Sequence, residues 1–276
     1  MSWLAVRAIV RKDLTSVLRN RGVRTPLLIT PVIILVLLPI LLVGGGELLA
    51  SSGTVPLDAI GSSPLDRLAD PQLQQRQTSD VPVEGRWAVF VLEVFLAPLY
   101  LLVPLVVATV IAADSFAGER ERGTLEALLH TPTRDRELML AKFLAAWLLA
   151  IAVAWGGFLV YGVLANVLAW PSVGRVFFPS ATWLLLGFWV APGVSALGLG
   201  VMVVVSGRVQ TLQAAHQIGS LVVLPVVLLM VAQLGGVLLF EPRLVILMGL
   251  LVWLLAAGVL RIGSGSLRRQ RLAERI

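Results

Sequence analysis

Long runs of apolar residues, separated by shorter polar stretches, dominate the pattern of this chain. Within each run the residues are apolar all round, without the polar face of a helix that lies on the surface of a soluble domain. A helix needs about 20 such residues to cross the hydrocarbon core of a bilayer. The pattern therefore predicts six membrane-spanning helices, at Thr25–Gly44, Trp87–Ala113, Phe143–Trp170, Ala181–Val205, Ile218–Phe240 and Leu244–Leu260.

The residues before the first run have a different, amphipathic pattern. Apolar residues recur there at spacings of three and four, at Trp3, Val6, Val10, Leu14 and Val17. Polar residues occupy the opposite side, at Arg11, Lys12, Thr15, Ser16 and Arg19. Such a helix lies in the plane of the membrane interface. We expect an interfacial helix within residues 1–24, either an elbow that meets a cytoplasmic partner or a plain surface helix, followed by one transmembrane domain over residues 25–276.

The distribution of lysine and arginine predicts the orientation of the spans. Seventeen of the 22 basic residues flank one side of the predicted membrane and five flank the other. Because cytoplasmic loops carry the excess of Lys and Arg, both termini, the central loop 114–142 and the tail 261–276 are expected in the cytoplasm. Trp87, Trp170 and Trp183 then fall at the outer interface, where aromatic side chains are enriched.

The remaining polar stretches are predicted as loops. The segment 44–86 begins with three glycines, contains four prolines and is expected outside, as a lid over an exit or, preferably, as a solvated linker. Pro171–Ser180 and Ser206–Gln217 are expected as short loops, and Asn166 as an inter-helix hydrogen-bonding residue. Prolines should kink several spans, and Gly193, Gly198 and Gly200 should allow close packing of the fourth.

Composition narrows the function classes. The chain is 58% hydrophobic, carries a net charge of +6 and has no cysteine, so no disulfide or thiolate site is expected. The basic residues lie beside the spans, where they meet anionic lipid headgroups, so nucleic acid is not expected as a partner. His130 and His216 belong to no H-E-x-x-H motif, and there is no G-x-S-x-G run, so neither a catalytic residue nor a metal site is predicted.

Glu93 is the one acidic residue well inside a predicted span. Carboxylates within the membrane are costly and often functional. It lies about two turns from Arg86 along a helix. Two interpretations remain open, a residue of the transport pathway and an interfacial pair with Arg86.

The loop between the second and third spans is unusually charged. Asp114 is expected to mark the exit of the second span into water. Glu119, Arg122 and Glu126 are spaced to pair on a helix surface, Gly123 weakens that helix, and Thr124 can cap a new one. Leu125, Leu128 and Leu129 would form its apolar side. This arrangement favours a docking element for another protein over a solvated interfacial helix.

The stretch GERERGTLEALLHTPTRDRELMLAKFL, Gly118–Leu144, resembles the signature of permease subunits of type-2 ABC transporters, which are mostly exporters. Ala141 stands where that family often has glycine. The loop SGRVQTLQAAHQ, Ser206–Gln217, is more weakly similar to the family. The matching residues are Glu119, Glu121, Gly123, Thr124, Leu125, Glu126, Leu128, Leu129, Thr131, Pro132, Glu137, Leu138 and Lys142.

The resemblance implies an all-α integral membrane protein in the cytoplasmic membrane of a prokaryote, with six spans and a cytoplasmic coupling helix. That helix would seat in a groove of a separate ATPase subunit. Two ATPase copies would serve two permeases, this chain with a second copy or a paralogue. ATP and Mg would be bound by the partner, since this chain has no G-x-x-x-x-G-K-[ST] run. The docking residues would be Glu119, Arg120, Glu121, Arg122, Gly123, Thr124, Leu125, Glu126, Leu128 and Leu129.

Two alternatives to export remain. A subunit of the same family could transmit force to an outer partner without moving a solute. A membrane scaffold could use the charged loop to dock a soluble protein.

Overall fold

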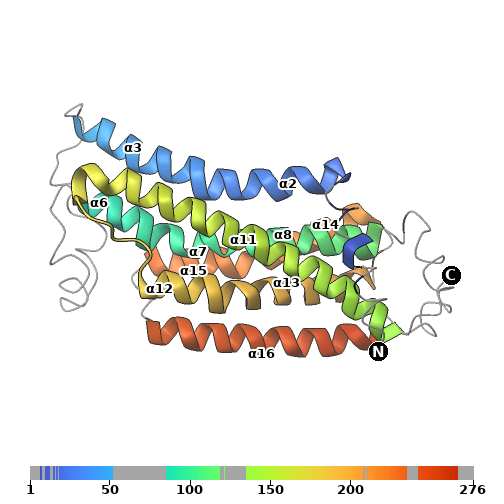
Figure 1. The fold of residues 1–276 in the computed structure, drawn as a ribbon. Helices are drawn as coiled ribbons and strands as arrows, with labels where there is room; N and C mark the ends of the chain where they lie inside the picture. The colour runs from blue at the N-terminus through green and yellow to red at the C-terminus, as the bar shows by residue number, and fades with distance from the viewer. Residues whose placement is uncertain are drawn as a thin grey trace.

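The computed structural model of the protein is a bundle of long helices that run side by side (Figure 1). The described parts of the chain are residues 19–51, 85–118, 135–207, 209, 211–234 and 242–266, with Arg7, Val10, Arg11, Lys12, Thr15, Val17 and Glu121. Within these residues all regular structure is helical. The described positions before Asn20 are helical too, with Val17 buried and Arg11, Lys12, Thr15 and Arg19 exposed.

Six helical segments are long and apolar enough to cross a membrane, which confirms the predicted number of spans. They are Gly22–Gly46, Arg86–Gly118, Leu140–Val173, Ala181–Ser206, Gln213–Ala232 and Pro242–Gly263. Successive spans run in opposite directions, so the start of the first and the end of the sixth lie at the same end of the bundle, on the right of Figure 1. That end is called the inner end below, and the opposite one the outer end.

Each span is built from one or more helical elements. The first contains α2 (Arg21–Val32), the π-helical segment η1 (Ile33–Leu37) and α3 (Leu38–Ser51). The second contains α6 (Arg86–Val89), η4 (Phe90–Phe95), α7 (Leu96–Tyr100), α8 (Leu102–Ala113) and η5 (Asp114–Gly118). The third is α11 (Asp135–Val173), and the fourth contains α12 (Ala181–Leu185), η6 (Leu186–Val190) and α13 (Ala191–Ser206). The fifth contains α14 (Leu212–Ser220), the 3₁₀ turn η7 (Leu221–Val223) and α15 (Leu224–Leu234). The sixth is α16 (Pro242–Ser266).

Proline explains three of the four π-helical segments in the described residues. η1, η4 and η6 end two or three residues before Pro39, Pro98 and Pro192, respectively. Proline has no N–H to donate to the helix ladder, but it is tolerated in the first turn of a helix. The wider π turn therefore closes one α-helical stretch and the proline begins the next. At these three prolines a π turn interrupts the regular α-helix of the span.

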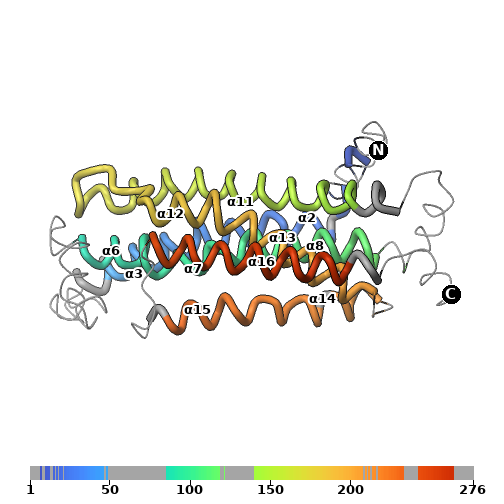
Figure 2. The backbone as a smooth tube through the Cα atoms, turned by 90° about the horizontal axis from the view of Figure 1, so that it is seen from below, coloured from blue at the N-terminus to red at the C-terminus, as the bar shows by residue number. Residues whose placement is uncertain are grey.

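The second and fourth spans form the centre of the bundle. In an apolar stretch of 18 residues within each of them, 67% of the residues are buried, against 18% in the fifth span and 17% in the sixth. Both views place α8 and α13 in the middle, with α2–α3 and α16 on opposite sides in Figure 1 and α11 and α15 on opposite sides in Figure 2. The outer helices expose leucine, isoleucine and valine, as lipid-facing surfaces do.

Glycines allow α13 to lie close to its neighbours, as predicted. A Cβ at Gly198 would come within 2.9 Å of Leu105 on α8. A Cβ at Gly193 or Gly200 would crowd Trp253 or Val259 on α16. Small residues at helix contacts let backbones approach, which is a main source of helix association in lipid.

Three helices extend beyond the expected bounds of their spans. The first does not stop at the triple glycine but continues to Ser51. The third continues through Pro171 to Val173, because a proline in the last turn removes only one helical hydrogen bond. The fifth begins at Leu212, where the Thr211 hydroxyl accepts a hydrogen bond from the N–H of Ala214 at 3.2 Å and caps the helix. The rest of the outer segment, residues 52–84, lies outside the described residues.

Candidate functional site

The predicted docking residues lie almost entirely outside the part of the chain that the structure describes. Of the ten, only Glu121 is described, and it is helical and exposed. The undescribed ones are Glu119, Arg120, Arg122, Gly123, Thr124, Leu125, Glu126, Leu128 and Leu129. Their role as a docking element stays a prediction, but the structure describes both helix ends between which they run.

Those two helix ends lie at the inner end of the bundle. η5 leads out of the second span, and α11 leads back into the third (Figures 1 and 2). α11 has 39 residues. At 1.5 Å per residue it is roughly 58 Å long, against ~30 Å for the hydrocarbon core of a bilayer. The helix is therefore longer than the apolar layer, and its first turn directly follows the charged loop in the sequence.

Asp114 does not mark an exit into water, as the sequence suggested. It is 4% exposed. The Asn20 side-chain amide donates a hydrogen bond to its carboxylate at 3.2 Å. A buried carboxylate needs such partners, and this one is supplied by a residue 94 positions away in the sequence. The N-terminal segment thereby contacts the inner end of the second span.

Asn20 makes a second hydrogen bond, within its own segment. Its backbone is extended, and its side-chain oxygen accepts from the N–H of Gly22 at 3.1 Å. It is therefore the N-cap of α2, where an asparagine oxygen satisfies one of the free N–H groups of the first turn. One side chain thus caps the first span and reaches the second.

Lys142 is buried within the bundle. It is 3% exposed, and its ammonium group donates to the backbone carbonyl of Ser115 at 3.1 Å. The ammonium also lies 5.7 Å from the centre of the Phe116 ring. The last carbonyls of a helix have no partner within the helix and favour a cation. The third span thus supplies a cation to the end of the second. Sequence reasoning recorded Lys142 only as one of the cytoplasmic basic residues and as a position of the family pattern.

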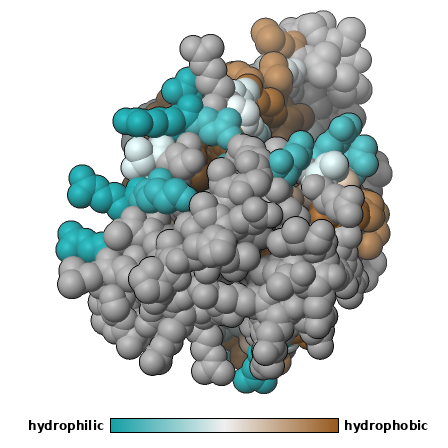
Figure 3. Space-filling view, turned by 90° about the vertical axis from the view of Figure 1, so that its right-hand side faces the viewer, coloured by the Kyte–Doolittle hydropathy of each residue, from teal (hydrophilic) through white to brown (hydrophobic). Residues whose placement is uncertain are grey.

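Figure 3 views the inner end of the molecule. Hydrophilic side chains are visible there beside hydrophobic ones. The exposed basic residues of this end include Arg19 and Arg24. They leave the inner end with positive charge at the surface, while Lys142 is enclosed.

At the outer end, Glu93 lies in η4 and is half-buried. The Ser180 hydroxyl lies beside its carboxylate. The carboxylate is also near enough to Tyr161 to interact electrostatically with its hydroxyl. Among the described residues no ion pair joins Glu93 to Arg86, which was one of the two roles that the sequence left open for this carboxylate. Glu93 therefore connects the second span to Ser180, the N-cap position of α12.

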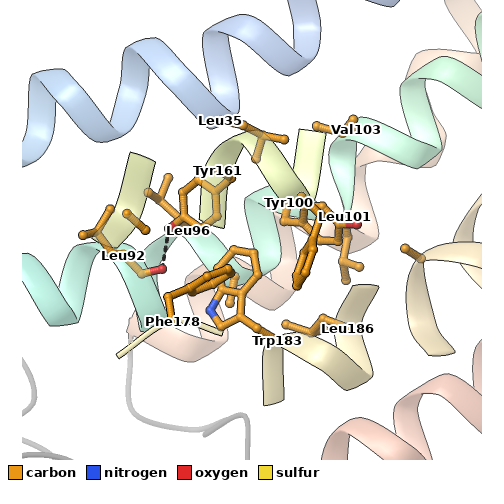
Figure 4. Close-up of a cluster of buried hydrophobic side chains, with 14 of the residues drawn as sticks. Leu35, Leu92, Leu96, Tyr100, Leu101, Val103, Tyr161, Phe178, Trp183 and Leu186 are labelled. Atoms are coloured by element: carbon orange, nitrogen blue, oxygen red, sulfur yellow. Dashed lines mark hydrogen bonds between the residues drawn. The ribbon is translucent and has the colours of Figure 1, made fainter. Parts of the chain in front are cut away.

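Aromatic side chains surround this part of the bundle. Tyr161 stacks on Trp183 with ring centres 4.8 Å apart, and Phe178 meets both rings edge-on. Figure 4 shows the three rings together, with the Tyr161 hydroxyl donating to the carbonyl of Leu92. Trp183 is fully buried, so it does not belong to the predicted aromatic belt. Its indole N–H instead donates to the carbonyl of Glu93 at 3.0 Å.

A second tryptophan makes the same contact with another π-helical segment. The indole of Trp155 donates to the carbonyl of Gly187 at 3.0 Å. Gly187 lies five residues before Pro192, as Glu93 lies five before Pro98. A π turn would bring an N–H to the carbonyl five residues earlier, and proline has none. In both places an indole from a neighbouring span donates to a carbonyl five residues before a proline.

Asn166 holds the segment that follows the third span. Its side-chain nitrogen donates to the carbonyls of Gly162 and Phe178, at 2.8 and 2.9 Å. Its oxygen accepts from the N–H groups of Phe177 and Phe178, at 3.0 and 3.2 Å. The expected inter-helix role is thus replaced by one within α11 and its following turn. In the described residues, no three acidic or histidine side chains come together as around a metal ion.

Comparison of the sequence with known protein families gives a match over most of the chain. The chain matches the family described as "ABC-2 family transporter protein" over residues 7–254. The match takes in the N-terminal segment, the charged loop and all of the first five spans. None of the curated proteins compared with the chain matches it.

Proposed function

The chain belongs to the ABC-2 family of transporter proteins, and from this premise we propose that it is the permease subunit of an ATP-driven exporter. The observation that carries the proposal is the position of the charged loop. Its two flanking helix ends, η5 and the start of α11, lie at the inner end of a six-span bundle. The loop carries the residues that resemble a coupling helix, Glu119–Leu129.

We propose that energy comes from a separate ATPase subunit. The sequence has no run of the phosphate-binding form G-x-x-x-x-G-K-[ST]. ATP and Mg would be bound by that subunit, and the charged loop would dock on it. A pair of permeases, this chain with a second copy or a paralogue, would then require two ATPase subunits.

Transport requires two global states that ATP binding favours differently. The bundle has features that suit such a change. The fifth span is mostly exposed, so it can shift against lipid or a second permease at small cost in buried contacts. The π-helical segments η1, η4 and η6 interrupt three spans near their prolines and are candidate bending points.

We propose that the inner end faces the cytoplasm. The exposed basic residues Arg19 and Arg24 lie there, and basic residues are retained on the cytoplasmic side. The charged loop then meets a cytoplasmic ATPase, as the mechanism requires. The setting would be the cytoplasmic membrane of a prokaryote.

Co-purification tests this function. The chain is expressed with a neighbouring gene for an ATPase that has a phosphate-binding loop, and is isolated in mild detergent. We expect the wild type to retain the ATPase and to hydrolyse ATP. Leu125→Asp should lose the ATPase, because it places a charge on the apolar side of the predicted docking helix. Leu65→Asp, the same change in the outer segment, is the matched control and should retain it.

Two outcomes would contradict the proposal. If the wild type retains no ATPase, the chain lacks the partner on which the proposed transport depends, and a scaffold for another soluble protein becomes the better account. If both variants retain it equally, docking does not use the leucine side of the loop.

A further inference from the structure

We infer that Asn20, Asp114 and Lys142 form a polar clamp that holds the inner ends of the first three spans together, so that they move as one unit with the charged loop. The inference rests on the proposed function, because it assigns positioning residues to the coupling step. The clamp consists of two contacts, Asn20 with Asp114 and Lys142 with the carbonyl of Ser115.

The first contact joins the start of the first span to the end of the second. Asn20 uses its oxygen to cap α2 and its nitrogen to reach Asp114. Both functional groups of the amide are therefore engaged, and α2 cannot turn about its axis without losing one of them. Val23, Leu27, Val107 and Phe116 belong to one buried apolar cluster formed by these two spans and their neighbours. The hydrogen bond itself is partly buried, and Asp114 is almost fully enclosed, so water has limited access to it.

The second contact joins the end of the second span to the third. The Lys142 ammonium is almost fully buried, and burying a charge is costly unless it is hydrogen-bonded. The carbonyl of Ser115 and the face of Phe116 provide favourable electrostatic contacts. These contacts link the third span to the inner end of the second.

The two contacts lie on either side of the charged loop in the sequence. Asp114 and Ser115 precede it, and Lys142 follows it. A push on a loop whose two ends could separate would deform the loop and leave the spans in place. With its ends fixed to each other and to α2, the same push displaces three spans. The clamp therefore converts a local displacement of the loop into a movement of the bundle.

Exchange of the two hydrogen-bonding partners is the sharpest test. Asn20→Asp keeps an oxygen that can cap α2 but places a second carboxylate beside Asp114. Asp114→Asn in the same chain restores an amide–carboxylate pair with the roles reversed. Lys142→Met removes the ammonium and keeps most of the apolar stem. Arg24→Met makes a comparable change at an exposed position of α2 and is the control.

Each variant is co-purified with the ATPase and reconstituted in vesicles. The amount of ATPase retained, ATP turnover per retained subunit and the unfolding midpoint are measured. We expect Asn20→Asp and Lys142→Met to retain the ATPase while turnover falls about fivefold or more, the lower range of typical coupling effects. The Asn20→Asp/Asp114→Asn exchange should recover most of the turnover. Arg24→Met should behave as the wild type.

The outcomes separate the clamp from the function on which it rests. If the wild type retains no ATPase, the proposed function fails. If the wild type is active and the two clamp variants keep wild-type turnover, the clamp inference is wrong. A second result would also overturn it: turnover falls only as far as the unfolding midpoint falls, and the Asn20→Asp/Asp114→Asn exchange restores neither turnover nor midpoint. The residues would then serve stability alone.

Discussion

The indole N–H of Trp183 donates to the carbonyl of Glu93, five residues before Pro98, which has no backbone N–H to donate. The contact joins the second and fourth spans, which are the two most buried in the bundle. A carbonyl without a donor is expensive in a membrane, since water is not available to replace it. The relationship leads to a prediction about both residues.

Trp183→Phe keeps an aromatic ring and removes the donor. We expect a loss of about 1 kcal/mol in the free energy of unfolding. Adding Pro98→Ala supplies a backbone N–H and should reduce that loss, as a double-mutant cycle would detect. Unfolding in mixed micelles with increasing denaturing detergent provides the measurement. Trp170→Phe, at a 55% exposed position, is the control. Additive losses in the double mutant would contradict the compensation.

Gly46 makes room for Trp87. A Cβ at this position would lie 2.3 Å from the indole nitrogen, which donates to the carbonyl of Leu42 at 3.1 Å. We expect Gly46→Ala to displace the ring and destabilise the protein by about 1–3 kcal/mol. Gly45→Ala has nothing within 4 Å of its added Cβ, so it should be neutral or stabilising by up to about 1 kcal/mol. Comparison of thermal unfolding midpoints tests the pair, and equal effects would show that the indole does not depend on this glycine.

Glu93 is expected to act as a structural tether to Ser180. Glu93→Gln retains a group that can hydrogen-bond to the Ser180 hydroxyl, so folding and ATP turnover of the complex should stay close to those of the wild type. Glu93→Leu removes the contact and should cost about 1 kcal/mol of stability. Turnover and unfolding midpoint are measured on the same preparations. A loss of turnover in Glu93→Gln with unchanged stability would instead assign the carboxylate to the transport pathway.

Cysteine labelling can determine the orientation of the bundle. The chain has no cysteine, so one introduced residue carries the whole signal. Val176 lies between α11 and α12 at the outer end, and Thr211 lies before α14 at the inner end; both are exposed. In intact cells a membrane-impermeant maleimide should label Val176→Cys and leave Thr211→Cys unlabelled until the cells are opened. The reverse pattern would place the charged loop outside, away from any cytoplasmic ATPase.

The number and approximate position of the spans could be predicted from sequence because the requirement is local. A run of apolar residues long enough to cross a bilayer is visible without knowledge of its neighbours. The glycine contacts of α13 could be predicted for the same reason, as small residues in a span usually face another helix. The family pattern in the charged loop also needed no tertiary information.

Long-range partners could not be predicted. Asp114 and Lys142 are charged residues near the ends of spans, where exposure to water is the ordinary expectation. Their burial depends on Asn20 and Ser115, and the first of these pairs is separated by 94 positions. The sequence placed Trp183 at the interface because tryptophan is common there. Its indole N–H instead donates a hydrogen bond to a backbone carbonyl of another span. In each case the deciding group lies on a different helix.

The contrast in burial between spans has a consequence for how this sequence can diverge. Residues of the fifth and sixth spans mostly face outward, so exchanges among leucine, isoleucine, valine and phenylalanine there should accumulate freely in relatives. The second and fourth spans are enclosed, and every change of volume must be matched by a neighbour. In an alignment of close relatives, one apolar residue should therefore often replace another in α15 and α16. In α8 and α13, a substitution in one helix should be accompanied by a compensating substitution in the other.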